Sequence, residues 1–160
     1  MKNLVVYYSR SGNTKIVAEE ISKIIECELE KIEFLNDIGS VRAAFTSLIG
    51  CKARIKHLNI DPKKYDNIFI GCPVWAGKSA TPMNTFLNNF DFTNKNVFIF
   101  ITQADSKTPV KVYESISKRV ADKGGNVADM FFVQTNMKSL ISSQQAMEAA
   151  TEWINKLRLK

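Results

Sequence analysis

Residues 4–14 are Leu4-Val5-Val6-Tyr7-Tyr8-Ser9-Arg10-Ser11-Gly12-Asn13-Thr14, an apolar strand that runs into a polar turn and then into a helix. The turn is rich in groups that hydrogen-bond an anion, namely Ser9, Ser11, Asn13 and Thr14. Gly12 lets the backbone bend close to a bound group, and the helix adds unpaired N–H groups and the positive end of its dipole. The turn from Ser9 to Thr14 therefore predicts a phosphate site, with Arg10 as its one side-chain charge. A hydroxyl-rich helix cap that binds nothing is the alternative.

The length and composition indicate a single domain that covers residues 1–160. The chain is 45% hydrophobic and holds ten Phe, which is enough to bury one sizeable core. No apolar run approaches the roughly 20 residues that cross a bilayer, and the N-terminus lacks a signal-peptide pattern. We therefore expect a cytoplasmic protein without membrane insertion. The three Cys residues are widely spaced and His57 is alone, so reduced thiols and no metal site are expected.

The net charge of +6 determines which partners the chain attracts at long range. Part of the excess lies in one segment, at Lys52, Arg54, Lys56, Lys63 and Lys64. A nucleic-acid surface would interleave such a patch with aromatic residues, and here Tyr65 alone is near. A solvated face is the favoured interpretation, so no nucleic-acid partner is expected.

Strand-like and helix-like segments alternate along the chain. After the first strand, apolar residues at helical spacing reach about Cys27, and a half-exposed strand follows through Leu29, Ile32 and Phe34. Ser40 is expected to cap a second helix that holds Val41 to Ile49. The later segments are strands at 67–72, 97–101 and 127–133, and helices through 83–90, 110–123 and 147–157. This alternation predicts a doubly wound α/β fold with a five-stranded parallel sheet and helices on both faces.

Two further loops follow the strands at 67–72 and 97–101. The first runs from Gly71 to Ser79 and nearly matches a Walker A motif, but five residues separate its glycines, which argues against an NTPase. Trp75 in this loop is expected to form a wall for a flat ring, and packing in the core is the alternative. The other loop, Thr102 to Ser106, offers amide, carboxylate and hydroxyl groups; a plain turn in which Asp105 or Ser106 caps a helix is equally compatible.

The string from Tyr8 to Thr14 after a first strand resembles the FMN phosphate loop of flavodoxins, and the likeness covers essentially the whole chain. The resemblance implies the strand order 2-1-3-4-5, with a ligand at the carboxyl ends of the strands, where the three loops converge. It implies an FMN phosphate held by Ser9, Arg10, Ser11, Gly12, Asn13 and Thr14. It also implies a flavin ring enclosed by Pro73, Val74, Trp75, Ala76, Gly77 and Lys78, and by Thr102, Gln103, Ala104, Asp105 and Ser106.

Ala76 departs from the pattern of many flavodoxins, which have a glycine after this aromatic residue. The peptide of that glycine flips on reduction and accepts a hydrogen bond from the flavin. An alanine pays a steric cost at positive φ that glycine avoids, so the usual flip requires Gly77 to take the role.

By resemblance, the leading function is one-electron transfer between redox partner proteins, with no catalytic residue and no metal in the protein itself. The basic charge differs from the many flavodoxins that are acidic and dock on basic reductases, so the partners stay open, as does the oligomeric state. The second hypothesis is an FMN-dependent NAD(P)H or quinone reductase, in which Lys78 and Lys107 would meet an anionic substrate. The third is a flavin-free scaffold that uses the same fold.

Overall fold

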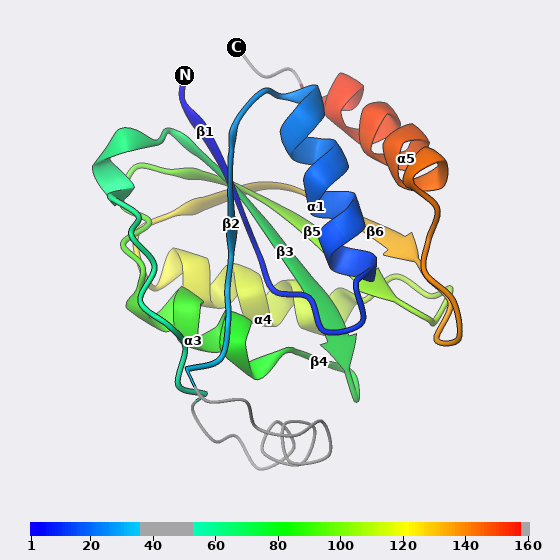
Figure 1. The fold of residues 1–160 in the computed structure, drawn as a ribbon. Coiled ribbons are helices and arrows are strands. Elements are labelled where there is room, and N and C mark those ends of the chain that lie inside the picture. The colour runs from blue at the N-terminus through cyan, green and yellow to red at the C-terminus, as the bar shows by residue number, and fades with distance from the viewer. Residues whose placement is uncertain (36–52, 158–160) are drawn as a thin grey trace.

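The structure is a computed structural model that describes residues 1–35 and 53–157. Strands and helices alternate along the described chain (Figure 1). The first half contains β1 (Asn3–Tyr7), α1 (Asn13–Ile24), β2 (Glu28–Lys31), the short 3-10 helix η1 (Pro62–Lys64) and β3 (Asn67–Trp75). The second half contains β4 (Lys78–Ser79), α3 (Thr81–Asn89), β5 (Asn96–Gln103), α4 (Val110–Ala121), β6 (Asn126–Gln134) and α5 (Ser143–Lys156).

The sheet has the order β2-β1-β3-β5-β6, and every neighbouring pair in this order is parallel. The two-residue strand β4 stands outside the order and pairs antiparallel with the end of β3. With β4 set aside, the five parallel strands follow the predicted order 2-1-3-4-5. The doubly wound fold predicted from the sequence is therefore confirmed.

The α-helices of the described residues cover the two faces of the sheet, two on each face (Figure 1). On one face, α1 and α5 pack over Val5, Phe69 and Phe100. On the other face, α3 and α4 pack over Val6, Ile70 and Ile99. Strands β3 and β5 are buried on both faces, which explains why their sequences are continuously apolar. Burial of apolar area on both faces supplies the main favourable free energy of this fold.

Several boundaries differ from those expected from the sequence. Helix α1 ends at Ile24 rather than near Cys27, because Glu26 takes a positive φ of 46° that a helix does not allow. Strand β2 ends at Lys31, and Phe34 forms only an isolated antiparallel bridge with Ile55. The helix expected from Ser40 to Ile49 lies outside the described residues.

The largest correction concerns residues 71–79, which the sequence suggested to be a loop. Strand β3 continues through Pro73 and Val74 to Trp75, and the chain then turns back into β4. Val74 pairs with Ser79 and Trp75 with Lys78, so the segment is a tight hairpin with Ala76 and Gly77 at its tip. Both tip residues have positive φ, 47° and 74°, as a type I′ hairpin turn requires.

The start of helix α4 contradicts one of the two interpretations of the loop after β5, in which Asp105 or Ser106 caps the helix. Its N-cap is Pro109, and no side chain caps it. The prediction that Asp105 or Ser106 caps this helix is therefore wrong. The Asp105 carboxylate instead accepts a hydrogen bond of 3.0 Å from the backbone N–H of Lys107, which stabilises the loop itself. In the part of the chain that the structure describes, no helix combines the length and apolar character needed to cross a membrane.

Candidate functional site

The three predicted segments follow the carboxyl ends of β1, β3 and β5, which are three consecutive strands in the sheet. Direct hydrogen bonds join them. The backbone N–H of Tyr8 donates to the carbonyl of Gly71 at 2.9 Å, which holds the turn after β1 against β3. The hydroxyls of Thr14 and Thr102 lie 2.7 Å apart and connect α1 with the end of β5. The fold therefore assembles these segments at one edge of the sheet.

The turn after β1 presents free backbone donors at the start of α1. Gly12 is the N-cap, with a left-handed φ of 106°, and no side chain caps the helix. The N–H of Gly12 donates to the Ser9 hydroxyl at 3.2 Å. Among the described residues, nothing accepts a hydrogen bond from the N–H groups of Asn13, Thr14 and Lys15 in the first turn. These donors and the helix dipole fit an anion such as a phosphate.

Two side chains that were predicted to bind the phosphate, those of Asn13 and Thr14, form hydrogen bonds within the protein instead. The carboxamide oxygen of Asn13 accepts a hydrogen bond of 2.8 Å from the Ile141 N–H, and its NH2 group donates to the Asn136 carbonyl. Asn13 and Thr14 are both buried. The groups left to meet a ligand are the backbone N–H groups, the hydroxyls of Ser9 and the exposed Ser11, and the exposed Arg10.

The segment between β6 and α5 forms a further wall that the sequence analysis missed. Asn13 holds it at Asn136 and Ile141, and a Cβ on Gly12 would lie 3.0 Å from the Leu140 side chain. Together with Ala104 and Gln134, this segment lines a pocket of about 670 Å³. The topological rule contained a signal for it, because residues 135–141 also follow the carboxyl end of a parallel strand.

Trp75 is half-buried at the end of β3. Its ring meets the Tyr8 ring edge-to-face at 5.4 Å, and the Arg10 guanidinium lies over it at 5.4 Å. The structure thus places Trp75 between the two expectations, packed on the core through Tyr8 yet partly accessible at the site. Burial raises the pKa of Tyr8 to about 12, although the nearby Arg10 opposes this shift.

A pocket of about 590 Å³ separates the hairpin from the loop after β5. Val74 and Gly77 line it from the hairpin, and Gln103, Asp105 and Lys107 from the other side. The Gln103 side chain shapes that loop, because its NH2 group donates to the carbonyls of Asp105 and Lys107. Ala76, Lys78, Ala104 and Ser106 are exposed but do not line this pocket, whereas Thr102 is buried against Thr14.

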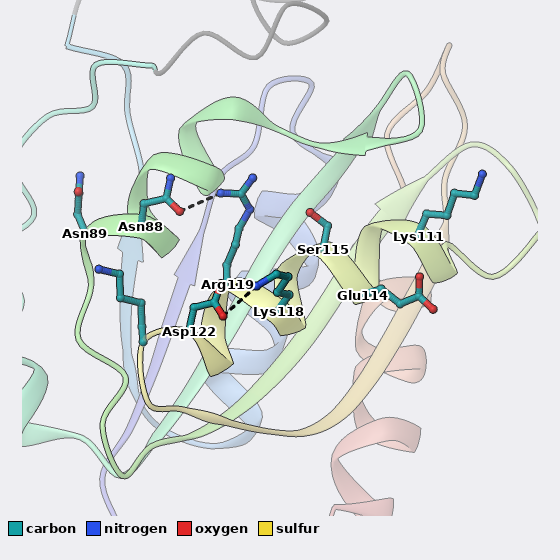
Figure 2. A pocket seen from close by; sticks show the side chains of 9 residues that line it. Asn88, Asn89, Lys111, Glu114, Ser115, Lys118, Arg119 and Asp122 are labelled. Carbon is teal, nitrogen blue, oxygen red and sulfur yellow. Dashed lines mark hydrogen bonds and ion pairs between the residues drawn. The ribbon is translucent and has the colours of Figure 1, made fainter.

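A different groove, of about 770 Å³, lies between α3 and α4 (Figure 2). Arg119 crosses it and donates to the Asn88 side chain at 2.8 Å, and Lys118 pairs with Asp122. None of the residues that line this groove belongs to the predicted site. Within residues 1–35 and 53–157, no cluster of three His, Cys, Asp or Glu side chains is placed to hold a metal.

The sequence matches the model of the flavodoxin domain family over residues 4–157. No functionally curated protein matches the chain. A flavoprotein from Lactobacillus acidophilus NCFM, solved in complex with FMN, is 34% identical and superposes with a TM-score of 0.68 over 82% of this chain and 92% of its own. Oxidised flavodoxin 2 from Bacillus cereus is 20% identical, with a TM-score of 0.60 over 98% and 100% of the two chains, and shares the fold. The family match spans residues 4–157 of the 160, so this chain belongs to the flavodoxin domain family.

Proposed function

We propose that this protein binds FMN at the carboxyl edge of its sheet and carries single electrons between redox partner proteins. The observation that carries the proposal is the free first turn of α1 beside the hairpin that bears Trp75. Hydrogen-bond donors for a phosphate and an aromatic surface for a ring therefore lie at the same edge of the sheet. Family membership and the 34% identical flavoprotein in complex with FMN support the same cofactor.

The protein groups would divide the work of binding. The N–H groups of Asn13 to Lys15 and the hydroxyl of Ser11 would bind the phosphate, and Arg10 would add a compensating charge. Trp75 would pack on one side of the ring system, and the loop from Ala104 to Ser106 would border it. Bound FMN supplies one- or two-electron redox chemistry, while the protein sets its position and its electrostatic surroundings.

Electron transfer between proteins requires a cofactor edge that a partner can approach. Ala76, Gly77 and residues 104–108 are exposed, and the connection from β5 to α4 is short. Among the described residues, this exposed edge supports a carrier more than a closed catalytic chamber. Cys27 and Cys72 are free thiols, which agrees with work in a reducing compartment such as the cytoplasm.

The test begins with FMN added to the apo-protein while flavin fluorescence is recorded. The bound complex is then reduced stepwise with dithionite under the spectrophotometer. Tight binding followed by reduction in two separate one-electron stages supports the carrier. A protein that stays colourless after incubation with FMN would contradict the proposal and leave a flavin-free scaffold.

The reductase alternative has one observation in its favour. Lys107 and Lys111 line the pocket beside the hairpin, where they would attract an anionic substrate such as a nicotinamide dinucleotide. The same preparation separates the two functions. Sustained oxidation of NAD(P)H by the FMN-loaded protein alone, with a quinone acceptor, would show a reductase; a carrier gives no turnover without a partner enzyme.

A further inference from the structure

The carboxyl edge of the sheet carries four exposed lysines that we call the basic rim: Lys78, Lys107, Lys111 and Lys138. They come from the hairpin, the loop after β5, the first turn of α4 and the segment after β6. None of them forms an ion pair with a described residue. Lys118 pairs with Asp122 at 2.8 Å. Figure 2 shows this pair, and it shows Lys111 extending away from the other side chains drawn.

Most of the other described lysines are in ion pairs, and the exceptions are Lys63, Lys64, Lys95 and Lys123. Ion pairs occupy Lys2, Lys15, Lys23, Lys31, Lys56, Lys118 and Lys156. Two carboxylates of the described chain lie in the same segments as the rim. Asp105 accepts a hydrogen bond from the backbone N–H of Lys107, not from its ammonium group, and Glu114 lies on α4. The rim with Arg10 therefore keeps a positive excess at the edge where electrons would enter and leave.

Exposed apolar side chains accompany these charges. Val110 is 51% exposed, Met137 is 89% exposed and Leu140 is 57% exposed. Val110 directly precedes Lys111, and Met137 directly precedes Lys138. Hydrogen bonds join the segment after β6 to the loop after β5, because the Gln134 side chain donates to the Ala104 carbonyl and the Thr135 N–H donates to the Gln103 carbonyl. Methionine and other apolar groups surrounded by charge are typical of docking surfaces for other proteins.

We infer that this edge docks an electron-transfer partner protein whose own docking face is acidic. The inference rests on the proposed carrier function and adds the chemistry of its partner. A positive rim raises the association rate with a negative face and disfavours basic partners. A small anion fits the rim poorly as the main occupant, because Lys107 and Lys111 line one pocket and Lys138 lines another. A protein surface reaches all of them together with the apolar side chains between them.

The test compares two double variants of equal net charge. Lys107→Glu/Lys138→Glu reverses two charges of the rim. Lys63→Glu/Lys64→Glu is the matched control, because both lysines are exposed in η1 at the opposite, amino edge of β3. Strand β3 has nine residues and spans about 30 Å, which is about three Debye lengths at 0.1 M salt and about one Debye length at 10 mM. Because both variants change the net charge equally, any difference between them reports the position of the charges and not their sum.

The first readout maps where an anion gathers, without any electron transfer. Tris(oxalato)chromate(III), a paramagnetic trianion, is added to the oxidised FMN-loaded protein at low salt, and amide NMR signals are recorded. We expect broadening at residues 104–111 and 136–140 in the wild type and in the control, and its loss in the rim variant. Equal broadening over the whole surface, or broadening centred on η1, would overturn the inference.

The second readout is the rate at which ferricyanide, an anionic one-electron oxidant, reoxidises the dithionite-reduced protein. At about 10 mM ionic strength we expect the rim variant to react about tenfold more slowly than the control. The two rates should converge at about 1 M, where the Debye length is about 3 Å.

Equal rates at low salt in two yellow, FMN-loaded variants would overturn the inference and leave the carrier function standing. Failure of the wild-type protein to bind FMN would instead refute the proposed function, so the two failures are distinct. Tight binding of a short single-stranded DNA that depends on the same lysines would reassign the face to nucleic acid.

Discussion

The hydroxyl oxygens of Thr14 and Thr102 lie 2.7 Å apart in the interior of the protein, 88 residues apart in the chain. Thr14 is 1% exposed and Thr102 is 3% exposed, so water does not replace either partner. The pair connects the first turn of α1 with β5 directly beneath the candidate site. It therefore contributes to the relative position of the segment that would hold the phosphate and the segment that would border the ring.

We predict that this pair behaves as a unit in stability measurements. Thr14→Val or Thr102→Val alone leaves one buried hydroxyl without a partner and should lower the free energy of unfolding by about 1–3 kcal/mol. The double variant replaces both hydroxyls by methyl groups and should cost much less than the sum of the single changes. Urea unfolding of the four proteins gives the coupling free energy. Strictly additive losses would show that the hydroxyls do not interact in solution.

The hairpin tip predicts opposite effects for two neighbouring substitutions. Ala76 has φ 47° and Gly77 has φ 74°, and a side chain in this region costs roughly 1–2 kcal/mol per residue. Gly77→Ala should therefore lower stability by about 1 kcal/mol, although a Cβ there meets no atom within 4 Å. Ala76→Gly should be neutral or slightly stabilising, because relief of strain offsets the larger entropy of the unfolded chain. Thermal unfolding of both variants tests this order, and a stability loss in Ala76→Gly exceeding that in Gly77→Ala would contradict it.

Tyr8 predicts a loss of stability at alkaline pH. Burial raises its pKa to about 12, whereas a phenol in the unfolded chain titrates near 10. Between these values the unfolded state has lost the proton and the folded state still binds it, so stability falls as pH rises. Stability should be insensitive to this group below about pH 9 and decline above pH 10. Tyr8→Phe removes the contribution, so urea unfolding at pH 9, 10 and 11 should give a shallower decline than in the wild type. Equal slopes would show that Tyr8 does not titrate as its burial implies.

The buried strands could be predicted from the sequence because their physical causes are local, whereas the order of the sheet was implied by the resemblance of residues 8–14 to the flavodoxin phosphate loop. Strands β3 and β5 are covered on both faces, and this produces uninterrupted apolar runs. The hairpin was not predictable in the same way. Strand β4 has two residues, too few for a pattern, and its turn contains an alanine where glycine or asparagine is the usual signal.

The candidate site was predicted at the level of its segments and less well at the level of side chains. Asn13 and Thr14 have groups suited to a phosphate, yet their partners Ile141 and Thr102 lie 128 and 88 residues away. Such tertiary contacts leave no signature within the turn itself. Contact between the predicted residues and FMN stays a prediction, which the following variants test.

Trp75 provides the sharpest test of where FMN binds, because the chain has two tryptophans in very different surroundings. Trp153 is buried, stacks on Phe131 at 4.9 Å and donates to Asp129 at 3.0 Å, on the face covered by α1 and α5. If the ring packs on Trp75, Trp75→Ala should weaken FMN binding by about tenfold, equivalent to about 1.4 kcal/mol. Trp75→Phe should recover part of the affinity, because it retains an aromatic face. Trp153→Phe is the control and should bind FMN like the wild type, with its remaining tryptophan emission strongly quenched when FMN is added. Unchanged affinity in Trp75→Ala, measured by titration of flavin fluorescence, would place the ring away from the hairpin and against the segment after β6.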